Sequence, residues 1–221
     1  MNFYRNNWYK LTFVAFVFLS FFMGFFGVGI LTPLQKILMF SFMALLVHQF
    51  EEYVLPGGGP VVINKANFGE KVNFRNFPGN MQSSMIVNNL AYAFYIAAII
   101  WPQFVWLGLA TMFFNLFQLV GHGFKMNRGM KTWYNPGLAS VVFLFVPISI
   151  YYMIYIVNNN LVTGWDWFGG AITFILAVLI TTILPVQILK DANSPYPIPE
   201  HQVKCCDEVQ AFASLERKKK K

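Results

Sequence analysis

Charged residues are scarce in this chain: they make up 11% of its 221 residues, and only nine residues are acidic. A soluble domain of this length carries roughly 25% charge, so the shortfall excludes that class. Cysteine is scarce as well. The two cysteines, Cys205 and Cys206, are neighbours in sequence and therefore cannot build a disulfide framework. We interpret them as reduced thiols in a cytosolic segment.

Apolar side chains are correspondingly abundant, at 57% of the chain, and 25 residues are phenylalanine. Several apolar runs reach the roughly 20 residues that cross a bilayer as a helix. This pattern predicts an all-α fold, a polytopic membrane helix bundle of about six transmembrane helices. The net charge of +7 does not indicate nucleic-acid binding, because the basic residues lie in loops and near the C-terminus, beside membrane lipid.

The chain divides into a transmembrane domain, residues 1–191, and a basic tail, residues 192–221. Prolines open the tail and lysines close it, so we expect it to be mostly disordered and cytosolic. The loop after the second span, about residues 56–83, is long enough to act as a lid. The predicted spans are about residues 11–30, 33–55, 84–101, 103–124, 137–157 and 166–189.

Basic residues also predict the orientation of the spans. Every lysine and arginine except Lys36 falls on the side that holds both termini and the loops after spans two and four. The positive-inside rule therefore places both termini in the cytosol. In a eukaryotic cell the terminal Lys-Lys-x-x pattern would also serve as an endoplasmic reticulum retrieval signal; the alternative is a polybasic anchor on anionic membrane lipid. The sequence indicates no oligomeric state.

Two of the nine acidic residues lie within one turn of an apolar segment. His48 precedes Glu51 by three residues and Glu52 by four, so the three side chains share about a third of the helix circumference. Ionisable groups at the edge of hydrocarbon are costly unless they are paired, hydrated or bound to a metal. Glutamates at the end of a helix also oppose its macrodipole. Two carboxylates and an imidazole are a donor set for a divalent metal ion or for proton transfer.

Other polar features fall at the same predicted depth, because spans two and four end there and spans three and five begin there. His122 lies near the end of span four, on one helix face with Asn115 and Gln118. Each feature also has a structural interpretation, since a buried histidine often makes one hydrogen bond and amides join helices. The remaining residues at this depth are Asn88, Asn89 and the segment Tyr134-Asn135-Pro136-Gly137.

The motif His48-Gln49-Phe50-Glu51-Glu52, followed by His122 and then by Tyr134-Asn135-Pro136-Gly137, resembles the HXXEE family of predicted membrane proteins. That family is named for its His-x-x-Glu-Glu motif and is marked by a second histidine and a Tyr-x-Pro-Gly motif, in the order found here. The resemblance covers about residues 34–157 and leaves out the first span and the basic tail. It implies a membrane protein with a site at these motifs, and it supplies no reaction.

The leading interpretation is a metal-dependent membrane enzyme, a hydrolase or an oxidoreductase, that acts on a lipid-like or amphiphilic substrate at the cytosolic membrane face. Two imidazoles and a carboxylate match catalytic zinc and equally match a non-haem iron site. In the zinc version the two histidines and one glutamate bind the ion, and the other glutamate is the general base on metal-bound water. The candidate metal ligands are His48, Glu51, Glu52 and His122.

An amide near the ion would orient a ligand or polarise a substrate carbonyl, and Asn88, Asn89 and Asn115 are the candidates. Hydrolysis and iron-dependent oxidation use the same donors, so the residues do not separate them. Two non-enzymatic interpretations also stay open. A buried histidine with carboxylates is a proton relay, which suits a proton-coupled transporter, although the chain has no inverted repeat. A structural membrane protein would use the cluster only to fix helix packing.

Overall fold

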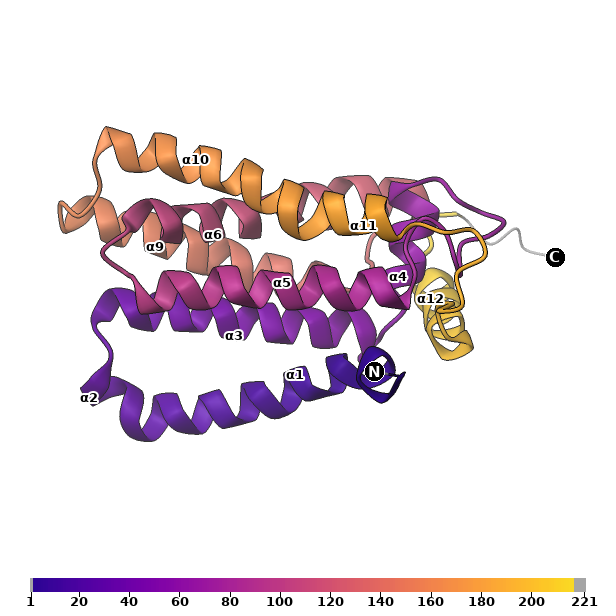
Figure 1. Ribbon diagram of the computed structural model, residues 1–221, viewed down its shortest axis with the longest axis horizontal. Helices are drawn as coiled ribbons and strands as arrows, with labels where there is room; N and C mark the ends of the chain where they lie inside the picture. The colour runs from indigo at the N-terminus through magenta and orange to yellow at the C-terminus, as the bar shows by residue number, and fades with distance from the viewer. Residues whose placement is uncertain (1, 217–221) are drawn as a thin grey trace.

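Helices hold 77% of the computed structural model, which describes residues 2–216 and has no β-strand among them. Six long helical runs lie side by side in a bundle (Figure 1). The first three are α1–η1–α2 (Asn2–Phe22, Met23–Gly27, Val28–Ile30), α3 (Pro33–Tyr53) and α5 (Met81–Ile100), where η marks a π-helical stretch. The other three are α6–η3–α7 (Val105–Gln118, Leu119–Met126, Asn127–Met130), α8–η4–α9 (Leu138–Ser140, Val141–Phe145, Val146–Asn158) and α10–η5–α11 (Gly164–Val178, Leu179–Ile183, Leu184–Leu189).

Three shorter elements gather at one end of the bundle, together with the start of α1 (Figure 1). We call this the basic end, because the segments that meet there carry most of the lysines and arginines of the described chain. The short elements are α4 (Gly59–Val62), η2 (Ile63–Asn67) and α12 (Glu200–Ala213).

Five of the six runs are long and apolar enough to cross a membrane. The remaining run, α3, is of similar length and carries the polar side chains of the His48 to Glu52 motif near its end. It packs against α1, α5 and α9, so its polar groups face protein and not lipid, as ionisable groups within a membrane require. Large apolar side chains such as Phe18, Phe25 and Ile175 are exposed on the outer faces. The predicted all-α membrane bundle of about six spans is confirmed.

Capping residues and chain breaks set the helix boundaries. The Thr32 hydroxyl accepts a hydrogen bond from the Gln35 amide, and Pro33 occupies the first position of α3. Asn80 caps α5 in the same way. Residues 101–104 leave the helical conformation, so α5 and α6 form two helices and not one kinked helix. The boundary predicted between the third and fourth spans therefore matches the structure.

The segment after α3 folds back over the end of that helix. Gly59 makes the approach close, since a Cβ atom at this position would lie 2.9 Å from Cβ of Glu52. Further along, the Asn64 side chain donates hydrogen bonds to the carbonyls of Phe74 and Gly79, at 2.8 and 2.7 Å. The loop that the sequence suggested as a lid thus covers the basic end of α3 as an ordered segment.

The expectation of a mostly disordered tail is wrong for residues 200–213, which form helix α12. Cys206, Val209 and Ala213 recur at spacings of three and four and are buried against the basic end. Prolines and charge suggested disorder, but the helix is stabilised by the protein surface on which it packs. The terminal lysines at 218–221, in which we saw a lipid anchor or a retrieval signal, lie outside the described residues.

Helix α12 is tied to the turn that follows α3. The Gln202 side chain accepts a hydrogen bond from the Gly58 amide and donates one to the Tyr53 carbonyl, both at 2.7 Å. Past the helix, the Leu215 amide donates to the Lys131 carbonyl at 2.9 Å. The C-terminal segment therefore joins the turn after α3 to the loop before α8.

Candidate metal centre

Three buried side chains from two helices converge near the basic end of the bundle. His48 and Glu52 lie one turn apart on α3, and His122 comes from η3. Oε1 of Glu52 lies 3.5 Å from Nε2 of His122 and 3.9 Å from Nε2 of His48. One ligand atom from each residue fits within 4.8 Å of the others, and none of the three residues is more than 6% exposed.

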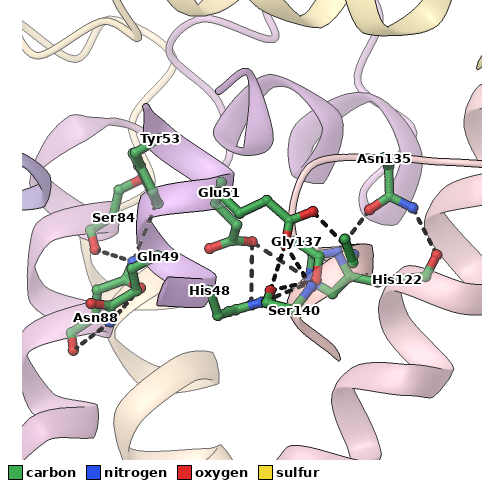
Figure 2. A network of polar contacts seen from close by, with 12 residues as sticks. His48, Gln49, Glu51, Tyr53, Ser84, Asn88, His122, Asn135, Gly137 and Ser140 are labelled. Carbon is green, nitrogen blue, oxygen red and sulfur yellow. Dashed lines mark hydrogen bonds and ion pairs between the residues drawn. The ribbon is translucent and has the colours of Figure 1, made fainter. Parts of the chain in front are cut away.

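The position of His122 depends on the wide turns of η3. π-helical turns are rare and occur frequently at functional sites, because they shift a side chain out of the register of the surrounding α-helix. The imidazole of His122 packs edge-on against that of His48, with ring centroids 4.9 Å apart (Figure 2). The two rings therefore lie close enough to bind one ion.

The hydrogen bonds of Asn135 define the tautomer of His122. The Asn135 amide nitrogen donates to the His122 carbonyl at 2.7 Å and to Oδ1 of Asn127 at 2.6 Å. Its Oδ1 therefore faces the ring and lies 2.7 Å from Nδ1 of His122 (Figure 2). An amide oxygen only accepts, so Nδ1 carries the proton and Nε2 has a free lone pair.

His48 has the same tautomer for a similar reason. Its Nδ1 lies 3.2 Å from the Gly137 carbonyl and 3.0 Å from the Ser140 hydroxyl. The carbonyl only accepts, and the hydroxyl already donates to Oε2 of Glu51 at 2.6 Å. Nδ1 of His48 must therefore donate, which leaves a lone pair on its Nε2.

Two lone pairs and a carboxylate oxygen thus face one another in a buried space. Nε2 of His122 has no hydrogen-bond partner among residues 2–216. A buried polar atom left without a partner costs about 1–3 kcal/mol. Three converging acceptors need a proton or a cation between them, and two neutral imidazoles with a carboxylate are the donors that zinc and iron prefer.

A cavity of about 350 Å³ opens onto these three side chains. Its walls come from α5, from α6 and η3, from η5 and α11, and from the α4–η2 segment. Leu45, Ala91 and Phe114 are among the apolar residues that line it. A fourth ligand, such as water or a substrate, would therefore reach an ion at the site through this cavity.

Glu51 is engaged elsewhere, although it neighbours Glu52 in sequence. Its carboxylate accepts hydrogen bonds from the amides of Ala139 and Ser140 at 3.0 and 2.7 Å. Tyr134 donates to it at 2.8 Å, and burial, followed by the Glu51 carboxylate, raises the pKa of this phenol so that it keeps its proton. Glu51 therefore caps the start of α8, where the helix dipole favours an anion. The structure separates the two glutamates that the sequence treats alike.

Gly137 lies between the two imidazoles. Its φ of +101° belongs to the left-handed region that glycine tolerates best. A Cβ atom there would lie 2.4 Å from Cε1 of His122 and 2.8 Å from Cε1 of His48. Gly137 precedes the first residue of α8, and it is also the spacer that lets both rings approach.

The predicted amide residues do not join the three ligands. The Asn89 oxygen accepts from Tyr4 at 3.0 Å, on the α1 side of α5. Asn115 joins three helices through Tyr95 and Ser41, which is the structural role that the sequence also allowed. Asn88 lines the cavity but accepts a hydrogen bond from Gln49 at 3.1 Å.

Asn135 and Ser140 have positioning roles that the sequence did not assign. Asn135 and Ser140 hold the Nδ1 atoms of His122 and His48 (Figure 2). Asn135 occupies the x position of the Tyr-x-Pro-Gly motif, so its place inside that motif was the available signal. Ser140 belongs to an apolar helix and offered none.

A family profile described as "Protein of unknown function with HXXEE motif" matches residues 39–152, more than half of the chain. The chain belongs to the HXXEE family. The matched region holds all three converging ligands together with Asn135, Gly137 and Ser140. It leaves out the whole of the run α1–η1–α2 and all of α10 to α12. No curated protein and no solved structure matches the chain.

Proposed function

We propose that this HXXEE protein is a metal-dependent membrane enzyme, a hydrolase or a non-haem iron oxidoreductase, with a lipid-like or amphiphilic substrate. The observation that supports the proposal is the convergence of three acceptors, Nε2 of His48, Nε2 of His122 and Oε1 of Glu52, in a buried space. A proton alone would satisfy one pair of these atoms, whereas one divalent ion satisfies all three.

The distances suit an ion. Ligand bonds of about 2.0–2.2 Å in a tetrahedral site place neighbouring donor atoms about 3.3–3.6 Å apart. Glu52 lies 3.5 Å from one imidazole nitrogen and 3.9 Å from the other. The ligand atoms of all three residues lie within 4.8 Å of one another, so the two imidazoles would draw closer together around an ion to complete the three-ligand set of a catalytic site, with the fourth position left for water or substrate.

The surrounding hydrogen bonds also suit an ion. Histidines that bind metals usually donate their other ring N–H to a carbonyl or carboxylate, which orients the ring. Here Asn135 performs that task for His122, and Gly137 with Ser140 for His48. A cluster that only fixed helix packing would not need both Nε2 atoms left free.

Because Glu51 and Glu52 make different contacts, we assign them different roles in the mechanism. A bound metal would act as a Lewis acid on water or on a substrate oxygen in the cavity. Glu52 is the carboxylate that lines this cavity beside the two histidines. We assign proton transfer to its second oxygen. We assign Glu51 to positioning, because its two oxygens accept four hydrogen bonds from the start of α8 and from Tyr134.

The cavity supports a substrate delivered from the bilayer, since an apolar pocket within a membrane domain favours an amphiphilic molecule. The proposal includes the membrane orientation that the basic residues favour, with the basic end and the site at the cytosolic face.

Metal analysis of the purified protein tests this function. Elemental analysis should find about one zinc or iron per wild-type chain. His48→Ala, Glu52→Gln and His122→Ala should each remove the metal and leave a folded protein with a melting temperature in detergent close to that of metal-stripped wild-type protein, because each loses the stabilisation that the bound ion supplies. His201→Ala is the matched control, since this third histidine lies on α12 outside the site. The proposed enzyme would be contradicted if the wild-type protein held no metal and the three variants differed from it only by a loss of stability.

A further inference from the structure

The cavity beside the three ligands is apolar at one end and polar at the other. Along η3 and α6, Phe114 lies eight residues before His122 and Lys125 three residues after it, or roughly 12 and 4.5 Å along the helix axis. The apolar end is lined by Ala91, Phe114, Phe117, Val178 and Ile183. The end towards the loops is lined by Asn64, Asn67, Phe68 and Lys125.

Lys125 gives the polar end an uncompensated positive charge. It lines both the cavity and a neighbouring surface depression, which Arg128 and Lys131 also line. Lys131 is paired with Glu216 at 2.7 Å, whereas Lys125 has no ion pair in the part of the chain that the structure describes. An ammonium group at the rim of an apolar cavity favours an anionic group.

A second polar atom at this end lacks a partner. Oδ1 of Asn67 is buried and accepts no hydrogen bond from residues 2–216. It lines the same cavity as Lys125. A ligand with a hydroxyl or N–H group next to its anionic group would satisfy both side chains.

We propose that the cavity binds a single-chain membrane amphiphile with an acidic head group, with the head at Lys125 and the chain between Ala91 and Val178. The inference rests on the proposed function in one respect: the metal ligands lie between the two ends, so the reacting group is the junction of head and chain. The acidic group is a phosphate or a carboxylate, and the molecule comes from the membrane.

Binding of dodecyl phosphate to the full chain in detergent tests the proposal, measured by native mass spectrometry with neutral dodecanol as the matched ligand. Lys125→Gln should weaken dodecyl phosphate binding about tenfold and leave dodecanol unchanged. Lys71→Gln is the control, because Lys71 is exposed on the same side and does not line the cavity. Ala91→Phe should weaken both ligands by filling the apolar end, and Val178→Phe is the second variant if that protein does not fold.

Equal binding of dodecanol and dodecyl phosphate, or wild-type affinity in Lys125→Gln, would overturn the inference about the head group. Unchanged binding in the variants of the apolar end would overturn the inference about the chain. Metal content of the same samples separates this proposal from the enzyme itself. Metal-loaded protein that binds dodecyl phosphate and dodecanol equally would contradict only the proposed substrate class. Metal-free protein that binds dodecyl phosphate through Lys125 would contradict only the metal centre.

Discussion

Nδ1 of His122 lies 2.7 Å from Oδ1 of Asn135, and the nitrogen of that same amide donates back to the His122 carbonyl at 2.7 Å. The pair closes a ring of hydrogen bonds that leaves one orientation of the amide and one tautomer of the imidazole. Binding of an ion by His122 depends on this pair, because a proton on Nε2 would block the ion.

Asn135→Ala should therefore lower metal affinity about 10- to 100-fold, as loss of the partner that orients a metal-binding histidine usually does. Chelator competition with zinc measures the change. Asn159→Ala should leave affinity unchanged, because this exposed side-chain amide donates to the Tyr155 carbonyl and makes no other hydrogen bond among residues 2–216. Wild-type affinity in Asn135→Ala would show that His122 does not need its partner.

Gly137→Ala should lose both metal and stability. Its left-handed backbone costs about 1–3 kcal/mol for a residue with a side chain, and the new methyl group would collide with both imidazoles. Metal content and thermal unfolding in detergent check the two effects. Gly164→Ala should change neither, because nothing lies within 4 Å of a Cβ atom at that position. A metal-loaded Gly137→Ala protein of normal stability would contradict the geometry of the centre.

Glu51→Gln and Glu52→Gln should fail in different ways. The first change should destabilise the fold by about 1–3 kcal/mol, because it sets an amide donor against the donors at the start of α8, and should leave metal content at saturation intact. The second should remove the metal and give a melting temperature close to that of metal-stripped wild-type protein. Unfolding midpoints and metal content are measured on both proteins. The reverse assignment of effects would mean that Glu51 is the ligand.

Both ends of the described chain should face the cytosol. In a Cys205→Ser, Cys206→Ser background, Arg128→Cys and Asp191→Cys should react with a membrane-impermeant maleimide only after the cytosolic face is exposed, whereas Asn160→Cys should react from the other side. The basic asymmetry of the chain is the reason. If positions 128 and 191 were labelled from opposite sides of the membrane, the result would contradict the six-span topology.

Much of this site can be predicted from the sequence, because the spacing of residues on a helix and the order of the spans follow directly from the chain. The four-residue step from His48 to Glu52 places both on one face of α3, and the end of the fourth span brings His122 to the same depth. The separate roles of Glu51 and Glu52 cannot be predicted from the sequence. Neighbours on a helix differ by about 100° in direction, and only tertiary packing decides which one meets the start of α8.

The remaining features depend on contacts far apart in the chain. Ser140 acquires its role from His48 and Glu51, about 90 residues away, as the separations of its hydrogen bonds show. Helix α12 needs the turn at Gly58 and Tyr53 as a docking surface, which composition alone does not reveal. The role of Gly137 as a spacer between two imidazoles exists only in the folded bundle, because His48 and His122 are distant from it in sequence.

X-ray absorption spectroscopy of the metal-loaded protein tests the metal centre most directly. Two imidazole ligands with metal–nitrogen distances of about 2.0–2.1 Å should appear in the wild-type spectrum, together with oxygen ligands. His122→Ala, if it retains any metal, should show one imidazole. A spectrum without imidazole scattering, with sulfur ligands from the cysteines, or with no bound metal to measure would contradict the account.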